Sequence, residues 1–226
     1  MNMHRIYAPF LRHFRRSRID FLYRVLDIGP ETRVVDVGGN TMFWEMAHRW
    51  GHAVPRVTVL NLLGPDYGPP GYRHSSLLPH LRQKISWVIG SATRIPLANR
   101  SFDVAFSNSL LEHLTPWRSQ QQCATEIRRV ARTYFVQTPN RKFFVEPHLL
   151  TPFVHWLSPA TQRRVIRNFT VWGVVTRPSA EQCAKFVSET KLLDRDEMRL
   201  LFPDANCLAE AFMFMPKSLL AVKTNA

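Results

Sequence analysis

Short apolar runs separated by amphipathic stretches make up most of the chain. Runs typical of buried strands, rich in β-branched and aromatic residues, occupy five ranges: 34–37, 56–61, 85–90, 101–108 and 134–137. Between them, apolar residues recur three and four positions apart, as in an amphipathic helix that begins near Thr41. Strands that alternate with helices in this way predict an α/β fold with a parallel sheet covered on both faces.

The N-terminal stretch predicts a helix over residues 4–27, which Gly29 and Pro30 end. Its apolar residues lie mostly on one side and its arginines on the other. We therefore divide the chain into a basic amphipathic helical extension, residues 1–28, and a single domain, residues 29–226. Such an extension could lie on an anionic membrane, cover a pocket, or pack on the domain with its arginines in water.

The formal charge of +13 widens the range of partners without selecting one. It permits nucleic acid, an anionic membrane surface or an acidic substrate, and it is equally compatible with a basic, solvated surface. No run of about 18 apolar residues is present, so no membrane span is expected. The N-terminus lacks the uninterrupted apolar segment of a signal peptide, and the three cysteines are far apart. These features predict a cytoplasmic protein with reduced thiols.

The most informative segment joins the first predicted strand to the next helix. Residues 34–37 are followed by Gly38, Gly39 and Asn40, residue types that tolerate positive φ and let the backbone approach a ligand. A strand, a turn and a helix in this order aim N–H groups and the positive helix end at an anionic group. Asn61 ends the second strand, 23 positions after Gly38, where doubly wound sheets place a side chain that reaches a ribose hydroxyl. A turn-forming Asn is the alternative.

These segments, taken in order, resemble the class I S-adenosylmethionine-dependent methyltransferases. The resemblance is closest to the small-molecule branch that contains the quinone-biosynthesis methyltransferases. It covers roughly residues 32–140, and its most specific part is the stretch IPLANRSFDVAFSNSLLEHL, residues 95–114. It implies a Rossmann-like, doubly wound sheet of seven strands, mostly parallel, with helices on both faces and a C-terminal antiparallel hairpin. Two strand-like segments, residues 207–215 and 218–223, joined by Pro216 and Lys217, fit that hairpin.

The resemblance also implies which residues bind S-adenosyl-L-methionine. The methionine part of this cofactor would be held by Asp36 and by the turn residues Gly38, Gly39 and Asn40. Asn61 would contact the ribose hydroxyls. The adenine would be contacted by Leu62, Ser91 and Ala92, and the sulfonium would lie beside Asn108 and Ser109. Asn40 and Met42 stand where the family has glycines, and Asn61 and Ser91 stand where it has acids. We therefore expect a modest affinity, and a chain that keeps the fold without the cofactor is the alternative.

The loop after the fifth strand, residues 138–148, should overhang the reaction site, because ligands of doubly wound sheets bind beyond the carboxyl ends of the strands. Four aromatic residues are candidates for the wall of an acceptor pocket with His148 as its polar contact: Phe143, Phe144, Phe153 and Trp156. A hydrophobic lid without ligand contact is the alternative. As a group, these aromatics indicate a small, apolar or aromatic acceptor.

Glu112 and His113 follow the fourth strand and allow two interpretations. In ubiquinone-type and small-RNA 3′-terminal methyltransferases, a Glu-x-x-Glu-His pattern resembles a magnesium site. Here Ser109 replaces the first carboxylate, and a hard cation needs several oxygens, so we predict no metal. His113 is then a candidate general base, or a residue that orders the loop near the cofactor.

The sequence thus predicts an enzyme that transfers a methyl group in line to a small hydrophobic acceptor, with O-methylation favoured. A nucleic-acid methyltransferase is the first alternative, but the Asn/Asp-Pro-Pro-aromatic run of base-amino enzymes is absent after the fourth strand, where residues 107–110 read Ser-Asn-Ser-Leu. A non-catalytic protein that binds membrane surfaces through its basic helix is the second.

Overall fold

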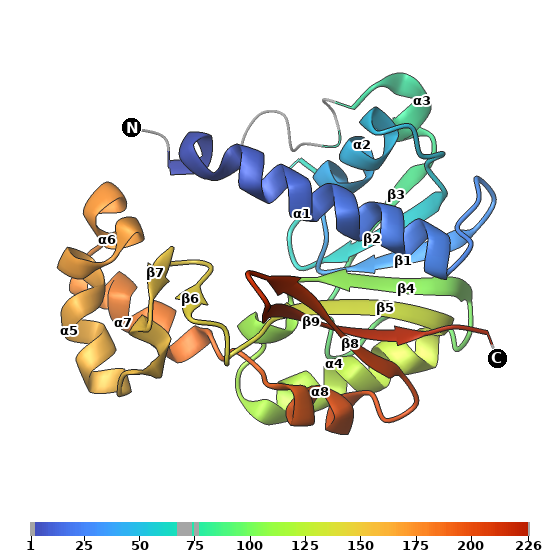
Figure 1. Cartoon of the computed structure of the whole chain (residues 1–226). Coiled ribbons are helices and arrows are strands. Elements are labelled where there is room, and N and C mark those ends of the chain that lie inside the picture. Colours follow the sequence, from blue (N-terminus) through green and yellow to red (C-terminus); the bar gives the residue numbers. More distant parts are fainter. Residues whose placement is uncertain (1–2, 67–73, 75–76, 226) are drawn as a thin grey trace.

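The computed structural model describes residues 3–66, 74 and 77–225, with the side chains of the first helix described from Phe14 onward. The described residues form a seven-stranded sheet in the order β3-β2-β1-β4-β5-β9-β8 (Figure 1). Its strands are β1 (Arg33–Val37), β2 (Arg56–Asn61), β3 (Ile85–Ile89), β4 (Phe102–Asn108), β5 (Ala131–Pro139), β8 (Asn206–Phe212) and β9 (Met215–Lys223). The first five strands are parallel, and β9 and β8 add an antiparallel pair at one edge. The predicted fold class is confirmed.

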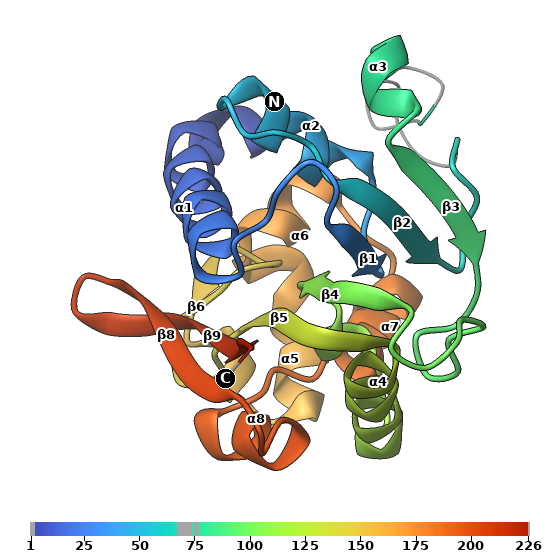
Figure 2. The same cartoon turned by 90° about the vertical axis from the view of Figure 1, so that its right-hand side faces the viewer.

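Helices cover both faces of this sheet (Figure 2). One face carries α1 (Met3–Val25), α2 (Thr41–Arg49) and α3 (Pro79–Arg82), and the other carries α4 (Trp117–Val130) and α8 (Arg195–Leu201). Strand residues alternate between the two cores, so that Val34 packs with the first group of helices and Val35 with the second. Among the described residues, no helix combines the length and apolar character that crossing a bilayer requires.

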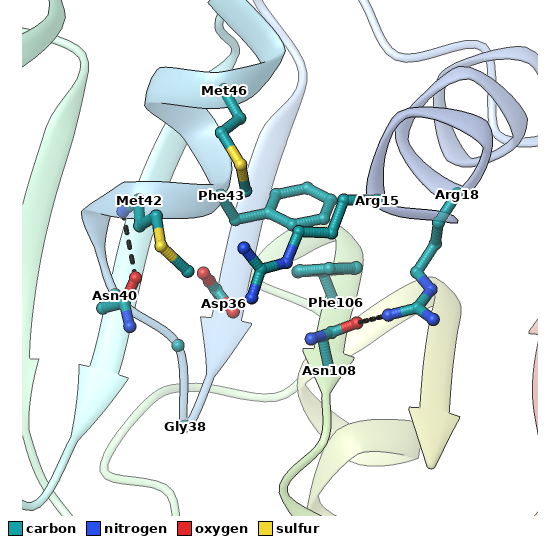
Figure 3. Close-up of a pocket in the computed structure, with 11 residues that line it drawn as sticks. Arg15, Arg18, Asp36, Gly38, Asn40, Met42, Phe43, Met46, Phe106 and Asn108 are labelled. Atoms are coloured by element: carbon teal, nitrogen blue, oxygen red, sulfur yellow. Dashed lines mark hydrogen bonds between the residues drawn. The ribbon is translucent and has the colours of Figure 1, made fainter. Parts of the chain in front are cut away.

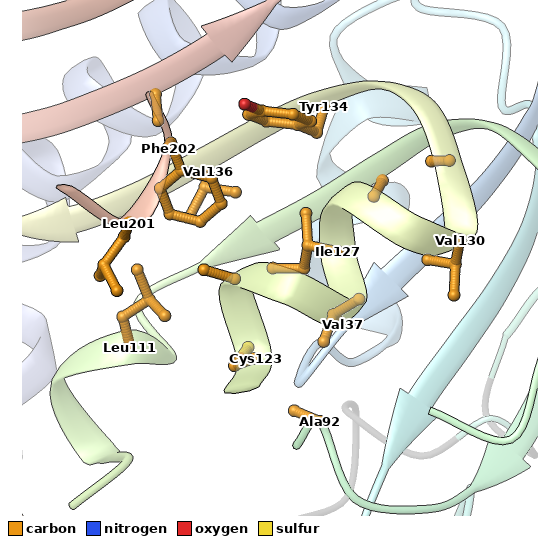
Figure 4. Close-up of a cluster of buried hydrophobic side chains, with 14 of the residues drawn as sticks. Val37, Ala92, Leu111, Cys123, Ile127, Val130, Tyr134, Val136, Leu201 and Phe202 are labelled. Atoms are coloured by element: carbon orange, nitrogen blue, oxygen red, sulfur yellow. The ribbon is translucent and has the colours of Figure 1, made fainter. Parts of the chain in front are cut away.

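The core beneath α4 and α8 fixes the position of β5 beside β4, the central strand of the sheet. Figure 4 shows Ile127 of α4 facing Val136 of β5, with Phe202 beside Tyr134. The Tyr134 hydroxyl donates a 2.7 Å hydrogen bond to an Asp204 carboxylate oxygen, which satisfies the one polar atom of this side chain. The packing thereby holds the carboxyl end of β5 beside that of β4.

A small helical lobe follows β5 and lies beside the sheet (Figure 1). Its elements are β6 (Val145–Glu146), β7 (Thr151–Pro152), η3 (Val154–Trp156), α5 (Pro159–Phe169), α6 (Val171–Thr176) and α7 (Ala180–Glu189). The lobe has its own cluster of buried side chains around Leu149 and Ile166. The loop expected over residues 138–148 is therefore the start of this lobe, which shows in the sequence only as further helical segments.

Helix α1 is joined to the sheet by apolar packing and by a buried ion pair. Ile19 and Leu22 are fully buried in the core that α1 shares with α2. The Arg18 guanidinium is 8% exposed and donates two hydrogen bonds to the Glu210 carboxylate, of 2.7 and 2.5 Å, and one of 2.5 Å to the Asn108 side-chain oxygen. Arg18 therefore connects α1 to strand β8 and to the carboxyl end of β4.

The C-terminal hairpin differs from the expectation at its turn. The chain reverses at Met213 and Phe214, which have φ of 46° and 64°, and not at Pro216 and Lys217. The expected position was wrong because neither Met nor Phe is a usual residue for the left-handed region. Pro216, which has no N–H to donate, is tolerated in β9 beside the register shift at Glu210 and Ala211.

We expect Glu210→Gln to destabilise the protein by about 3 kcal/mol, because it leaves the buried Arg18 guanidinium without a carboxylate partner. Urea unfolding at neutral pH measures this change. Glu189→Gln is the matched control, since Glu189 forms an exposed pair with Lys185 that contributes less than about 0.5 kcal/mol. Equal midpoints for the two variants would show that the ion pair does not hold α1 in place.

Candidate active site

The turn between β1 and α2 needs glycine at both of its first two positions. Gly38 has φ +77°, and a Cβ there would lie 2.6 Å from the Leu110 side chain. A Cβ on Gly39 would lie 2.0 Å from the Asp36 carboxylate. Asn40 then caps α2, because its side-chain oxygen accepts a 2.9 Å hydrogen bond from the Met42 N–H. The sequence thus folds this turn tightly against the end of β1.

Asp36 is a buried carboxyl with one unused oxygen. It is 1% exposed, and one of its oxygens accepts a 2.8 Å hydrogen bond from the Trp44 indole N–H. The other oxygen, Oδ1, has no hydrogen-bond partner in the structure, and burial raises the pKa of this carboxyl to about 7. An unpaired buried oxygen is costly, and this one could accept a hydrogen bond from a ligand or pair with a positively charged group.

A small cavity of about 100 Å³ opens at this turn (Figure 3). Asp36 and the glycine turn form one side of it, and Arg15 and Arg18 of α1 form the other. Figure 3 shows the Arg15 guanidinium pointing into the cavity toward Asp36. A carboxylate and a guanidinium on opposite sides suit a zwitterion. Sequence analysis missed these arginines, because α1 is far from the turn in the chain, although it named the covering of a pocket as one role for this helix.

Of the ten residues expected at the cofactor, five line this cavity: Asp36, Gly38, Gly39, Asn40 and Asn108. Asn61 supports the turn from β2. Its side-chain N–H donates a 2.9 Å hydrogen bond to the Gly39 carbonyl, and its oxygen accepts one of 3.3 Å from the Leu63 N–H. These bonds match the turn-forming interpretation, while a ribose contact stays a prediction. Leu62, next to it, is 70% exposed and offers free apolar surface.

The other three expected cofactor residues lie further along the same edge. The Ser91 hydroxyl pairs with that of Thr93 at 2.9 Å, and Ala92 is buried in the core beneath α4. Ser109 has φ 55° and its hydroxyl donates a 3.0 Å hydrogen bond to the Gln137 side chain. Their contacts with a nucleoside or a sulfonium stay predictions.

A larger cavity of about 490 Å³ adjoins the first, and we call it the apolar cavity. The two cavities share Arg15, Arg18 and Asn108. Its apolar wall comes from α1, the start of the small lobe and the C-terminal hairpin: Phe14, Phe143, Val145, Pro147, Leu150 and Phe212. This volume lies within the range of about 300–1,000 Å³ that is usual for small-molecule sites.

The expected aromatic wall was only partly right. Of the four aromatics, only Phe143 lines the apolar cavity. Phe153 and Trp156 are about half exposed, and the Trp156 indole N–H donates a hydrogen bond to the Arg141 carbonyl. Phe14 and Phe212 take their place in the wall, and their distance along the chain hid them from a local pattern.

His113 and His148, the expected catalytic residues, lie together with ring centroids 4.9 Å apart. Neither lines the two cavities as the described residues define them. Partial burial and the nearby His148 lower the pKa of His113 to about 4. Burial also opposes the charged form of His148, but a 2.7 Å hydrogen bond to Glu146 and the charges of Glu146 and Glu112 outweigh it and raise the pKa. His148 is therefore the more basic and better oriented of the two.

Glu112, His113 and His148 also bring three possible metal-ligating atoms within 4.8 Å of one another. Glu112 is fully buried, its Oε1 has no hydrogen-bond partner in the structure, and burial raises the pKa of its carboxyl to about 6. One carboxylate and two imidazoles do not fit Mg²⁺, which prefers oxygen ligands. The expectation that no metal binds stays a prediction, and no step below depends on one.

The central part of the chain resembles a known protein family. A family model described as a methyltransferase domain matches residues 50–134, which run from the end of α2 into β5. Among curated proteins, no sequence matches this chain.

Solved structures resemble the whole chain. A candidate O-methyltransferase from Nostoc punctiforme PCC 73102 is 10% identical, with 96% of this chain and 57% of that chain covered and a TM-score of 0.57. A second structure is geranyl diphosphate C-methyltransferase from Streptomyces coelicolor A3(2), in complex with Mg²⁺, geranyl diphosphate and S-adenosyl-L-homocysteine. It is 16% identical, with 87% of this chain and 61% of that chain covered and a TM-score of 0.52. The chain spans about three fifths of the length of these two proteins.

A third structure has nearly the same length as this chain. It is the 1,6-didemethyltoxoflavin-N1-methyltransferase of Burkholderia thailandensis with 1,6-didemethyltoxoflavin and S-adenosylhomocysteine bound. It is 14% identical, with 100% of this chain and 92% of that chain covered and a TM-score of 0.54. At such identities the likeness shows the fold alone. The chain has the fold of the class I methyltransferases and its central segment matches a methyltransferase domain, which confirms the resemblance that the sequence predicted.

Proposed function

We propose that the protein is an S-adenosylmethionine-dependent methyltransferase that acts on a small, largely apolar acceptor. The observation that carries this proposal is the unpaired Asp36 oxygen, which faces Arg15 across the glycine turn at the carboxyl edge of the sheet. S-adenosylhomocysteine is bound in two of the related structures, which supports the same cofactor here.

The residues at the turn fit the amino-acid end of this cofactor. The Asp36 oxygen would accept a hydrogen bond from its ammonium group, and Arg15 and the N-terminus of α2 would attract its carboxylate. A cavity of about 100 Å³ is too small for the whole cofactor, so the nucleoside would extend over Asn61 and the exposed Leu62. When bound, the cofactor supplies a methyl group that its sulfonium has already activated.

The protein's own contribution is then alignment and exclusion of water. Asn108 lines both cavities and Ser109 lines the larger one beside it, where the methyl group would pass from cofactor to acceptor. The apolar cavity keeps water away from the acceptor atom. O-methylation needs a base for the acceptor hydroxyl. We propose His148, oriented by Glu146, for this role, which requires it to reach the apolar cavity that it does not line in this structure.

The alternatives have less support. A nucleic-acid acceptor has the charge of +13 in its favour, but the cavity beside the turn is walled by apolar side chains. Peripheral contact with an anionic membrane and a cytoplasmic location stay predictions from the basic helix and the cysteine pattern.

We expect S-adenosylhomocysteine to bind the wild type and to bind Asp36→Asn about 10- to 100-fold more weakly, because the variant loses a charged hydrogen bond. Isothermal titration calorimetry at pH 8, where the wild-type carboxyl is ionised, measures both affinities. Asp103→Asn is the matched control, since Asp103 pairs with Arg33 at the opposite edge of the sheet. No binding by the wild type would refute the cofactor, and equal affinities for wild type and Asp36→Asn would refute this placement of it.

The same variant should be more stable than the wild type in the absence of ligand. The pKa of Asp36 is about 7 in the folded protein, and an unfolded Asp titrates near 3.9, so between these values only the folded state holds this proton. The free energy of unfolding of the wild type therefore falls relative to that of Asp36→Asn as the pH rises from about 4 to about 7. A pKa raised by about three units corresponds to about 4 kcal/mol, so at about 2–4 °C per kcal/mol we expect Asp36→Asn to melt about 10 °C higher at pH 8 and at the same temperature near pH 4. A difference that does not change with pH would contradict the raised pKa.

A further inference from the structure

One end of the apolar cavity is positively charged. Lys217 of β9 lines this end together with Arg15 and Arg18 of α1. The Lys217 ammonium nitrogen lies 3.9 Å from the centroid of the Phe14 ring, which holds it at the cavity wall. Among the described lining residues there is no carboxylate. Three basic side chains therefore line a cavity whose other described lining residues are uncharged.

The acid closest to Lys217 among the described residues is already paired. Glu210 of β8 uses both of its oxygens to bind Arg18. The ion pair of its carboxylate is therefore with Arg18 and not with Lys217. Burial lowers the pKa of Lys217 to about 8, with a further lowering by the charges of Arg18 and Arg15 that Glu210 only partly opposes. The Lys217 ammonium is thus held charged in a place that disfavours its charge, which an anion in the cavity would relieve.

The backbone holds Lys217 in this position. Its carbonyl accepts a 3.0 Å hydrogen bond from the Asn140 N–H, and the Asn140 side chain donates one of 2.7 Å to the Pro216 carbonyl. These two bonds fix the start of β9 to the loop that follows β5. The cation is therefore part of a defined wall and not a freely moving surface lysine.

We propose that the apolar cavity binds an acceptor with an apolar body and an anionic group, such as a carboxylate, a phosphate or a phenolate, which pairs with the Lys217 ammonium. The role of this molecule as methyl acceptor rests on the proposed function, whereas the anion site itself does not. An uncharged apolar ligand would bury the ammonium without a partner, which is unfavourable. Lys217 is thus a residue that determines specificity.

Two fluorescent probes with the same aromatic rings test this site. 1-Anilinonaphthalene-8-sulfonate is anionic, and N-phenyl-1-naphthylamine lacks the sulfonate. We expect Lys217→Met to weaken binding of the anionic probe at least about tenfold and to leave the uncharged probe within about twofold, while Lys217→Arg retains both affinities. Lys185→Met is the matched control, because Lys185 lies exposed on α7, away from the cavity.

The pH dependence gives a second measurement. The charged groups that face Lys217 are Arg15 and Arg18 from α1 and Glu210 from β8. Because the pKa of Lys217 is lowered to about 8, its ammonium loses its charge between about pH 7 and pH 9. The wild type should lose affinity for the anionic probe over this interval, and Lys217→Arg should not. Three results would overturn the proposal. The first is a loss of affinity for the anionic probe in Lys185→Met as large as in Lys217→Met, and the second is an equal loss for both probes in Lys217→Met. The third is the same pH profile for the anionic probe in the wild type and in Lys217→Arg.

The outcome is separable from that of the proposed function. Lys217→Met should bind S-adenosylhomocysteine as the wild type does, because Lys217 does not line the smaller cavity. Cofactor binding without probe discrimination would overturn the anion site alone. Probe discrimination in a protein that binds no S-adenosylhomocysteine would leave the anion site and overturn the methyltransferase.

Discussion

The buried contact of Arg18 with Glu210 and Asn108 determines where both cavities are. It joins residues 192 and 90 positions apart in the chain and fixes α1 over the carboxyl edge of the sheet. With α1 in place, Arg15 reaches the cavity at the glycine turn and Phe14 forms part of the wall of the apolar cavity. Without this contact, the helix would still have an apolar face to bury, but its angle to the sheet would lose the polar bonds that define it.

The glycine turn buries the Asp36 carboxyl in a way that lowers the stability of the folded protein. Gly38 and Gly39 leave room for the backbone to bend back against Asp36, and Asn61 holds the turn closed from the neighbouring strand. This arrangement buries a carboxyl with one oxygen unpaired, which costs free energy. A purely structural role would be served better by an uncharged residue, so the retained carboxyl is best explained by a ligand.

The parts of the molecule that the sequence predicted well are the local ones. The strand, turn and helix around Asp36 lie within residues 33–49, where each element shows in its own local pattern. Contacts between distant segments were not predictable in this way. Phe212 reaches the acceptor wall only because β8 pairs with β9, and the turn at Met213 and Phe214 carries no glycine to reveal it. His148 joins His113 through the lobe after β5, whose separate core has no distinct sequence signal.

Helix α1 contributes to both cavities. Arg15 and Arg18 line the two, and Phe14 lines the apolar one. A ligand that pairs with Arg15 would bind only the arrangement in which α1 lies against the sheet, so it would stabilise that arrangement by mass action. The same arrangement completes the small cavity around Asp36, and any coupling between the two ligands would by linkage be reciprocal. The basic helix that the sequence predicts as an extension therefore supplies side chains to both parts of the candidate site.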